Sequence, residues 1–313
     1  MSFENFARLT GVLLLNKPFI TSFENIETNP KKIKRGDLFI GDKKEDIELA
    51  LENEAYAIVT TSSIDILDKE IAWFKTNSLD EVLIKLLRFS LVDKNFHFIL
   101  VNHIEIEILK KISTKTDIVF LDDDEKESYK KIINADEKKI FFSTNKEFLI
   151  QIYPDFEVLK DVNMLFQKRV KSLFLSNFTY LEKNYTNIKI SPLFLEHLER
   201  IVSFLNANSI DYEIEKLSFS NHFHPIFVNK KLQLKAFGKS ENVIICESQK
   251  SLIKKEIAYL QKEASWAKTI EVDLDELEKL KSIEFNFAII ICKYDKLIEI
   301  LENNEKKEQV VLF

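Results

Sequence analysis

Short β-branched or aromatic runs alternate with longer helical periodicities along this chain. In its first part, the strands are predicted at Phe23–Thr28, Asp37–Ile40, Ala55–Thr60 and Ile71–Thr76, and the helices at Glu45–Asn53 and Leu79–Phe89. Ser78, with acidic residues after it, is expected to cap the second helix. The apolar residues of that helix recur on one face, so it should bury a single stripe.

The middle of the chain repeats this alternation more regularly. The unbroken apolar run Phe96–Val101 predicts a strand that is covered on both faces. The elements predicted after it are helix Glu105–Ile112, strand Asp117–Leu121, helix Glu125–Ile133, strand Lys139–Ser143, strand Lys171–Ser176 and a helix from Pro192 to Asn206. Strand, helix, strand at this spacing is typical of βαβ crossovers and a mainly parallel sheet.

The last part of the chain again mixes strands and helices. Strands are predicted at Pro225–Val228, Leu232–Ala236, Asn242–Cys246, Thr269–Val272 and Phe285–Ile291, and helices at Ser251–Ser265 and Tyr294–Asn303. The chain therefore belongs to the α/β class, and 313 residues are enough for two or three small domains.

Composition excludes several classes of function. The chain has only four Gly, none of them in a phosphate-binding cluster such as GxxxxGK. The net charge of −6 argues against a nucleic-acid partner, which usually needs a basic excess. The basic run from Lys31 to Arg35 is short, and acidic residues follow it.

Neither the apolar runs nor the cysteines indicate a membrane or secreted protein. The longest apolar stretches, such as Phe285–Cys292, are far below the roughly 18 to 20 residues that span a bilayer. Gly11–Leu15 is too short for the core of a signal peptide. Cys246 and Cys292 each sit in an apolar run without CxxC spacing, so both are expected to be inert core thiols in the cytoplasm.

Residues 23–63 resemble the N-terminal domain of the Mur ligases, the ATP-dependent amide ligases that build the peptidoglycan stem peptide in bacteria. The turn that reads Lys34, Arg35, Gly36, Asp37, Leu38, Phe39 carries the resemblance, together with the strand Ala55–Thr60 that follows a helix. The opening Phe6, Leu9, Thr10, Gly11 resembles the first helix of that family. The subgroup that adds D-alanyl-D-alanine is the most similar one.

The resemblance implies a ligand site in this region. Thr28, Asn29, Pro30 and Lys31 stand where the family has a Thr-Asp-Ser-Arg loop that helps to hold the uridine-diphosphate end of the substrate. The ligand-binding residues that it implies are Thr28, Asn29, Lys31, Arg35 and Gly36. Asn29 lacks the carboxylate and Pro30 lacks a backbone donor, so a plain tight turn is the alternative. Gly36 is expected to have a positive φ.

The ATP site of the family is not recognisable. There, the strand that corresponds to Phe96–Val101 runs into a Gly-rich loop that ends in Gly-Lys-Thr/Ser. Here it is followed by Asn102, His103, Ile104, Glu105, Ile106, Glu107, without glycine, lysine or hydroxyl. Glu105 and Glu107 place negative charge where a triphosphate would bind. We therefore predict no cofactor and no catalytic residues; His103, at the tip of the strand, is a further candidate ligand-binding residue.

Other polar residues are weaker candidates. Asp122, Asp123 and Asp124 follow a strand, where magnesium or ribose could bind, but Asp124 as a helix cap explains them. His222 and His224 would share one face of a strand, yet no third zinc ligand is readable, and no metal is predicted. Ser176 would be a nucleophile only beside a histidine and an acid. Trp73 and Trp266 are expected in a core or at its edge.

These observations combine into one interpretation. A Mur-ligase-like N-terminal domain (1–92), a reduced Rossmann-like parallel-sheet central domain without a phosphate loop (93–225) and a short α/β C-terminal domain (226–313) are predicted. The expected function is non-catalytic and linked to peptidoglycan precursor synthesis, through binding of a UDP-linked muramoyl peptide or of a cell-wall enzyme. The alternatives are an active ATP-dependent ligase with a non-standard site, or a protein-interaction module unrelated to the cell wall.

Overall fold

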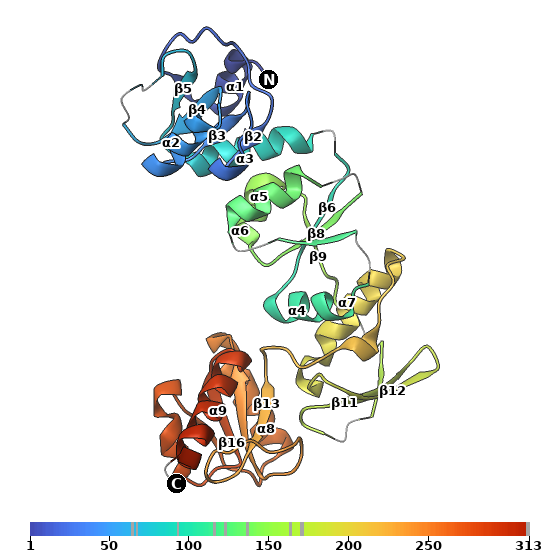
Figure 1. Ribbon diagram of the computed structural model, residues 1–313. Coiled ribbons are helices and arrows are strands. Elements are labelled where there is room, and N and C mark those ends of the chain that lie inside the picture. The colour runs from blue at the N-terminus through green and yellow to red at the C-terminus, as the bar shows by residue number, and fades with distance from the viewer. Residues whose placement is uncertain are drawn as a thin grey trace. The chain divides into compact units, whose positions relative to one another are not determined.

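The computed structural model describes residues 1–63, 66, 68–92, 94–114, 117–121, 124–135, 138–162, 165–169 and 172–310, with side chains through residue 304 (Figure 1). The backbone divides into two units. The first is Met1–Val101 with Thr116–Val158, and the second is Asn102–Lys115 with Leu159–Phe313. The predicted domain boundaries after residues 92 and 225 stay a prediction.

The first unit begins with a five-stranded sheet in the order β1-β5-β4-β3-β2. Its strands are β1 (Leu13–Leu14), β2 (Ile26–Glu27), β3 (Leu38–Ile40), β4 (Ala57–Thr60) and β5 (Ala72–Lys75). Its helices are α1 (Phe3–Thr10), the short 3-10 helix η1 (Pro30–Lys32), α2 (Lys44–Glu52) and α3 (Leu79–Leu91). Strands β2 to β5 are parallel, and β1 is antiparallel to β5. Each predicted element of this part is present.

Alternation along the strands supplies a core on each face of this sheet. Leu38 and Ile40 of β3 pack with Phe6 of α1 and Leu83 of α3, while Phe39 between them packs with Ile47 of α2. The Ser78 hydroxyl accepts a hydrogen bond from the Glu81 N–H at 3.2 Å, which confirms the predicted cap of α3.

The turn before β3 depends on glycine. Gly36 has φ +97°, a conformation that a Cβ disfavours. Next to it, the buried Asp37 carboxylate accepts hydrogen bonds from the Lys34 N–H at 2.9 Å and the Asn25 amide at 3.0 Å. The turn is thus fixed from within the chain.

We expect Gly36→Ala to lower the free energy of unfolding by about 1 kcal/mol, because alanine is strained at positive φ. Urea titration measures this change. Gly36→Asn is the matched variant and should lose less, since asparagine tolerates the left-handed region better than alanine. Equal stability of Gly36→Ala and the wild type would contradict the role of backbone strain here.

The first unit continues with a parallel sheet in the order β7-β8-β6-β9. Its elements are β6 (His97–Leu100), β7 (Ile118–Phe120), α5 (Glu125–Ile133), β8 (Ile140–Ser143), α6 (Lys146–Ile152) and β9 (Glu157–Val158). The Phe98 and Phe141 rings stack in its core, with centroids 4.9 Å apart. The Asp124 carboxylate accepts from the Lys126 and Glu127 N–H groups, so the predicted cap is confirmed. Asp122 and Asp123 lie outside the described residues.

The second unit starts with α4 (His103–Ile112), which packs on α7 (Leu195–Ala207). A three-stranded antiparallel sheet lies between them in sequence, formed by β10 (Gln167–Lys168), β11 (Ser176–Tyr180) and β12 (Lys183–Ile188). The predicted strand Lys171–Ser176 was wrong over residues 172–175, because the Ser172 hydroxyl accepts from the Phe174 and Leu175 N–H groups and bends the chain. Ser176 begins β11, and Lys171 lies outside the described residues. The 3-10 helices η2 (Pro192–Phe194) and η3 (Ile214–Lys216) flank α7.

A four-stranded sheet in the order β13-β14-β16-β15 completes the second unit. Its elements are β13 (His224–Val228), β14 (Asn242–Glu247), η4 (Lys250–Leu252), α8 (Ile253–Glu263), β15 (Thr269–Glu271), η5 (Leu274–Lys281), β16 (Phe287–Ile291) and α9 (Tyr294–Val310). Strands β14, β16 and β15 are parallel, and β13 is an antiparallel edge strand. The predicted strand Leu232–Ala236 was wrong, because Leu232 has φ +61° and the segment turns.

Burial agrees with most of the predicted core residues. Trp73 is only 1% exposed, as predicted, but Trp266 is 75% exposed, so its assignment to a core or to the edge of one was wrong. Cys246 and Cys292 are free and buried, as predicted. Among the residues that the structure describes, no helix has both the length and the apolar content that a bilayer crossing needs.

Candidate functional site

Polar residues follow each parallel strand of the N-terminal sheet at its carboxyl end. Thr28 comes after β2, Asp42 after β3, Thr60 ends β4 and Lys75 ends β5. The carboxyl edge of parallel strands is where ligands of open α/β sheets bind. This edge is therefore the candidate ligand site of the first unit.

Asp42 organises this edge. Its carboxylate accepts hydrogen bonds from the Thr60 hydroxyl at 2.8 Å and from the Thr61 N–H at 2.6 Å, and the Lys75 ammonium donates to the Thr61 carbonyl. Partial burial raises the pKa of Asp42, but the hydrogen bonds from Thr61 and Thr60 outweigh it and leave the pKa below its ordinary value. The carboxylate stays charged at neutral pH.

The predicted ligand-binding residues do not all lie at this edge. Thr28 lies there, and its buried hydroxyl oxygen has no hydrogen-bond partner in the described part of the chain. Asn29 also follows β2, and its side chain caps η1 by accepting from the Lys31 N–H at 3.1 Å. Arg35 and Gly36 precede β3 and lie at the opposite, amino edge, where the Arg35 Nε donates to the Tyr56 hydroxyl at 3.3 Å.

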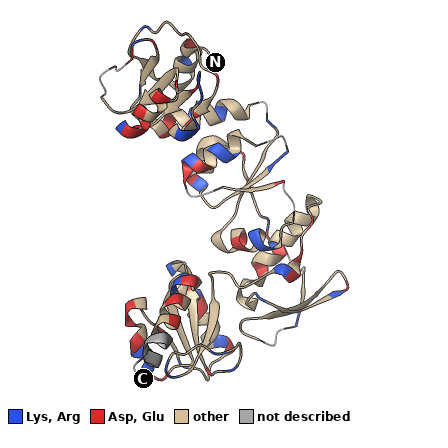
Figure 2. Ribbon diagram, viewed as in Figure 1, with Lys and Arg blue, Asp and Glu red and all other residues tan. Residues whose placement is uncertain are grey.

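An unpaired group of cations covers the connection between β2 and β3. Lys31, Lys32, Lys34 and Arg35 are all exposed, and none of them forms an ion pair with another described residue. On the helices elsewhere in the chain, acidic and basic residues are mixed (Figure 2). This connection, in a chain of net charge −6, is thus a local attractor for anions.

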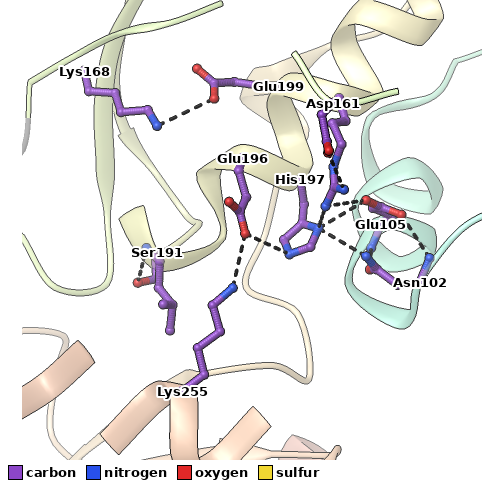
Figure 3. Close-up of polar contacts among 11 residues, drawn as sticks. Asn102, Glu105, Asp161, Lys168, Ser191, Glu196, His197, Glu199 and Lys255 are labelled. Carbon is purple, nitrogen blue, oxygen red and sulfur yellow. Dashed lines mark hydrogen bonds and ion pairs between the residues drawn. The ribbon is translucent and has the colours of Figure 1, made fainter. Parts of the chain in front are cut away.

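The second candidate site is the start of α4, directly after β6, where the Mur ligases carry their phosphate loop. The Asn102 side chain accepts a hydrogen bond from the Glu105 N–H at 2.9 Å, and the Glu105 carboxylate accepts one from the Asn102 N–H at 2.9 Å (Figure 3). This reciprocal pair is a capping box, and it uses two of the helix N–H groups that would otherwise face a ligand.

Arg200 is the counter-charge of Glu105. The Glu105 residue is only 3% exposed, and its carboxylate lies 3.1 Å from the His197 Nδ1 (Figure 3). The same carboxylate lies 3.0 Å from the Arg200 guanidinium. Arg200 also lies 2.7 Å from the His197 Nδ1 and pairs with Asp161 at 3.1 Å. Because a guanidinium can only donate, the His197 Nδ1 accepts, and the positive charge beside Glu105 belongs to Arg200.

Glu107 also forms hydrogen bonds within the second unit. It accepts hydrogen bonds from the Asn221 N–H at 2.8 Å and from the Asn221 side-chain amide at 3.1 Å. One turn further along α4, the Lys111 ammonium donates to the Ser218 and Phe219 carbonyls. Both acids that follow β6 thus hold the second unit together, whereas His103, the first residue of α4, is exposed.

The other sequence candidates have structural partners. His222 precedes β13 and lies 2.7 Å from the Glu247 carboxylate, whereas the His224 ring stacks on Tyr294 with centroids 4.0 Å apart, so a shared strand face was wrong. Burial lowers the pKa of His224 to about 4. Ser176 donates to the Ile190 carbonyl at 2.7 Å. Within the described residues, no group of three or more His, Cys, Asp or Glu side chains could hold a metal ion.

Sequence reasoning missed Asp42, Thr60 and Lys75, and it also missed His197 and Arg200. A signal existed for the first three, since each ends or follows a strand that was predicted from the sequence. For the pair on α7 there was none, because their contact with Glu105 joins residues more than ninety positions apart in the chain.

Comparison with solved structures defines the class: the chain has a Mur-ligase-like fold. It resembles MurF from Acinetobacter baumannii with a TM-score of 0.52 and 9% identity, over 92% of this chain and 85% of that one. It also resembles the MurF ligase from Thermotoga maritima, solved in complex with ADP, with a TM-score of 0.50 and 13% identity, over 91% and 98%. No family model and no curated protein matches the sequence. The resemblance noted from the sequence is confirmed for the fold.

Proposed function

We propose that this chain is a Mur-ligase-like protein that binds a UDP-muramoyl-peptide precursor and does not catalyse ATP-dependent ligation. The observation that carries the proposal is the closed start of α4, where the buried Glu105 carboxylate takes the helix N–H group and the Arg200 guanidinium for itself. Phosphoryl transfer depends on positive charge placed around the phosphates. Here that charge is already neutralised from within the chain.

The charges at the start of α4 support this interpretation. Because the Glu105 carboxylate lies 3.0 Å from the Arg200 guanidinium, the pair offers no net positive charge to a triphosphate. Displacing Glu105 instead would leave a buried carboxylate without its partner. Either route opposes Mg-ATP at this position.

The first unit supports the part of the proposal that concerns binding of the precursor. The exposed cations Lys31, Lys32, Lys34 and Arg35 of the connection between β2 and β3 suit a diphosphate. The MurF-like fold supports a muramoyl-peptide nucleotide as the proposed ligand.

Isothermal titration of the full chain tests both parts of the proposal, the lack of Mg-ATP binding and the binding of the precursor. We expect no binding of Mg-ATP at millimolar concentration, and binding of UDP-N-acetylmuramoyl-tripeptide that weakens as salt rises. The double variant Lys31→Ala/Arg35→Ala should weaken precursor binding about tenfold, because it removes two unpaired cations. Lys230→Ala, which removes an exposed cation of the second unit, is the matched control and should leave affinity unchanged.

Two outcomes would overturn the proposal. Phosphate release that depends on a muramoyl peptide and on D-alanyl-D-alanine would favour an active ligase with a non-standard site. A chain that binds neither nucleotide would favour the protein-interaction module.

A further inference from the structure

A short connecting segment in the second unit, residues 218–223, is fixed from two sides; we call it the strap. On one side, Glu107 and Lys111 of α4 bind Asn221 and the carbonyls of Ser218 and Phe219. On the other side, the Ser248 N–H after β14 donates to the Asn221 carbonyl at 3.0 Å. The strap leads directly into β13, so its position is coupled to the last sheet.

The strap ends in strained backbone. Phe223 is buried and has φ +50°, a left-handed conformation that costs a non-glycine residue of order 1–3 kcal/mol. Such a conformation persists only where surrounding contacts fix it. Here the contacts come from Glu247, at the end of β14.

Glu247 is fully buried and well supplied with donors. Its carboxylate lies 2.7 Å from the His222 Nδ1, accepts from the Phe223 N–H at 3.2 Å and accepts from the Gln249 N–H at 2.6 Å. Hydrogen bonds of this kind favour the charged form of a carboxyl group. The Glu247 carboxylate thus ties His222 and Phe223 of the strap to the end of β14.

Glu256 of α8 is also fully buried, but it has no donor. Neither of its carboxyl oxygens has a hydrogen-bond partner in the described part of the chain, and its neighbour is the Glu247 carboxylate. Burial, then the nearby Glu247 carboxylate, raises the pKa of Glu256 to about 11. At neutral pH the folded chain thus carries a proton on Glu256.

We propose that the strap and α8 open as a proton-releasing unit: Glu256 keeps its proton while the strap is closed and releases it to water when the strap opens. A solvated glutamate has a pKa of about 4.3. Between this value and about 11, the open state therefore binds one proton fewer than the closed state. The population of the open state should rise tenfold for each unit of pH, which makes the strap a pH-sensitive element.

The other charged groups near the strap have partners of their own or stay neutral. The pKa of His224 is lowered to about 4, so it stays neutral over the relevant range. Glu107 is hydrogen-bonded to Asn221, Lys111 to the strap carbonyls, and Asp295 and Tyr294 begin α9 beside His224. His222 is the remaining titratable group in contact with Glu247, so it needs its own control.

Amide hydrogen exchange of the full chain, followed by mass spectrometry from pH 6 to pH 8, tests the proposal. Intrinsic exchange rises tenfold per pH unit, and the opening equilibrium adds a second factor of ten. Peptides from the strap and α8 should therefore exchange about a hundredfold faster per pH unit. Peptides from the N-terminal sheet should show the ordinary tenfold rise.

Two variants test whether the released proton comes from Glu256 or from His222. Glu256→Gln keeps the shape and a donor toward Glu247 but has no proton to release, so its strap and α8 should return to the tenfold rise. His222→Gln should keep the hundredfold rise. A tenfold rise in the wild type, or a hundredfold rise in Glu256→Gln, would overturn the proposal. If Glu256→Gln does not fold, infrared detection of a protonated carboxyl group in the wild type at pH 8 decides, and its absence is contrary to the proposal.

Discussion

Replacing Glu105 by alanine should lower the free energy of unfolding by about 3 kcal/mol, because it removes one partner of a largely buried ion pair. The variant leaves Arg200, whose side chain is 21% exposed, without its main counter-charge, and the Asn102 N–H without its acceptor. Because Arg200 is partly exposed, the expected loss in the free energy of unfolding is at the lower end of the range for broken buried ion pairs. Urea denaturation followed by circular dichroism measures it.

The nature of the Glu105 site can be tested further with added anions. In Glu105→Ala, the Asn102 N–H loses its acceptor and the Arg200 guanidinium loses its main counter-charge, so phosphate or formate should restore part of the lost stability. Chloride at the same ionic strength is the control for screening. Glu107→Ala, which removes hydrogen bonds to Asn221 but no ion pair, should lose about 1 kcal/mol and gain nothing from phosphate. Equal losses in the two variants would contradict the special role of Glu105.

The same substitution at two neighbouring acids should have opposite effects. Glu247→Gln is expected to lower the free energy of unfolding by about 3 kcal/mol, because an amide cannot replace a buried carboxylate that has three donors around it. Glu256→Gln should raise it by several kcal/mol at pH 8, because the folded wild type has to keep a proton there that the unfolded chain releases.

The pH dependence gives the sign of this second effect. The pKa of Glu256 is raised in the folded state, so its contribution is fully present below about pH 4.3 and is lost as pH rises toward about 11. The wild type should therefore lose about 1 kcal/mol per pH unit from this group through neutral pH, and Glu256→Gln should lose less. Urea midpoints at pH 6, 7, 8 and 9 measure the slopes. Parallel slopes in the two proteins would contradict the protonated state of Glu256.

Local signals made most of the fold predictable. The alternation around Leu38 and the apolar stripe of α3 each determine which side of the element packs in a core. Ser78 and Asp124 mark helix starts because their side-chain oxygens accept hydrogen bonds from the first helix N–H groups. The antiparallel β11–β12 hairpin was missed because Leu181 and Glu182, both at positive φ, form a turn without the usual glycine or asparagine. In the segment after Val228, apolar spacing predicted a strand that the turn at Leu232 excludes.

The candidate site was predictable only in part. The sequence alone placed negative charge at Glu105, but Arg200, which neutralises it, is distant in the chain. Thr28 and Gly36 are close in sequence and were predicted to belong to one ligand site. The crossover from β2 to β3 separates them, because parallel neighbours require the chain to return to the amino edge.

The contrasting exposure of the two tryptophans gives each unit its own spectroscopic reporter. Trp73 is enclosed beside Ile47 in the first unit, whereas Trp266 faces water in the second. Iodide should quench the emission of Trp266 and spare that of Trp73. With Trp266 changed to phenylalanine, the remaining fluorescence follows the first unit by itself, without any attached dye.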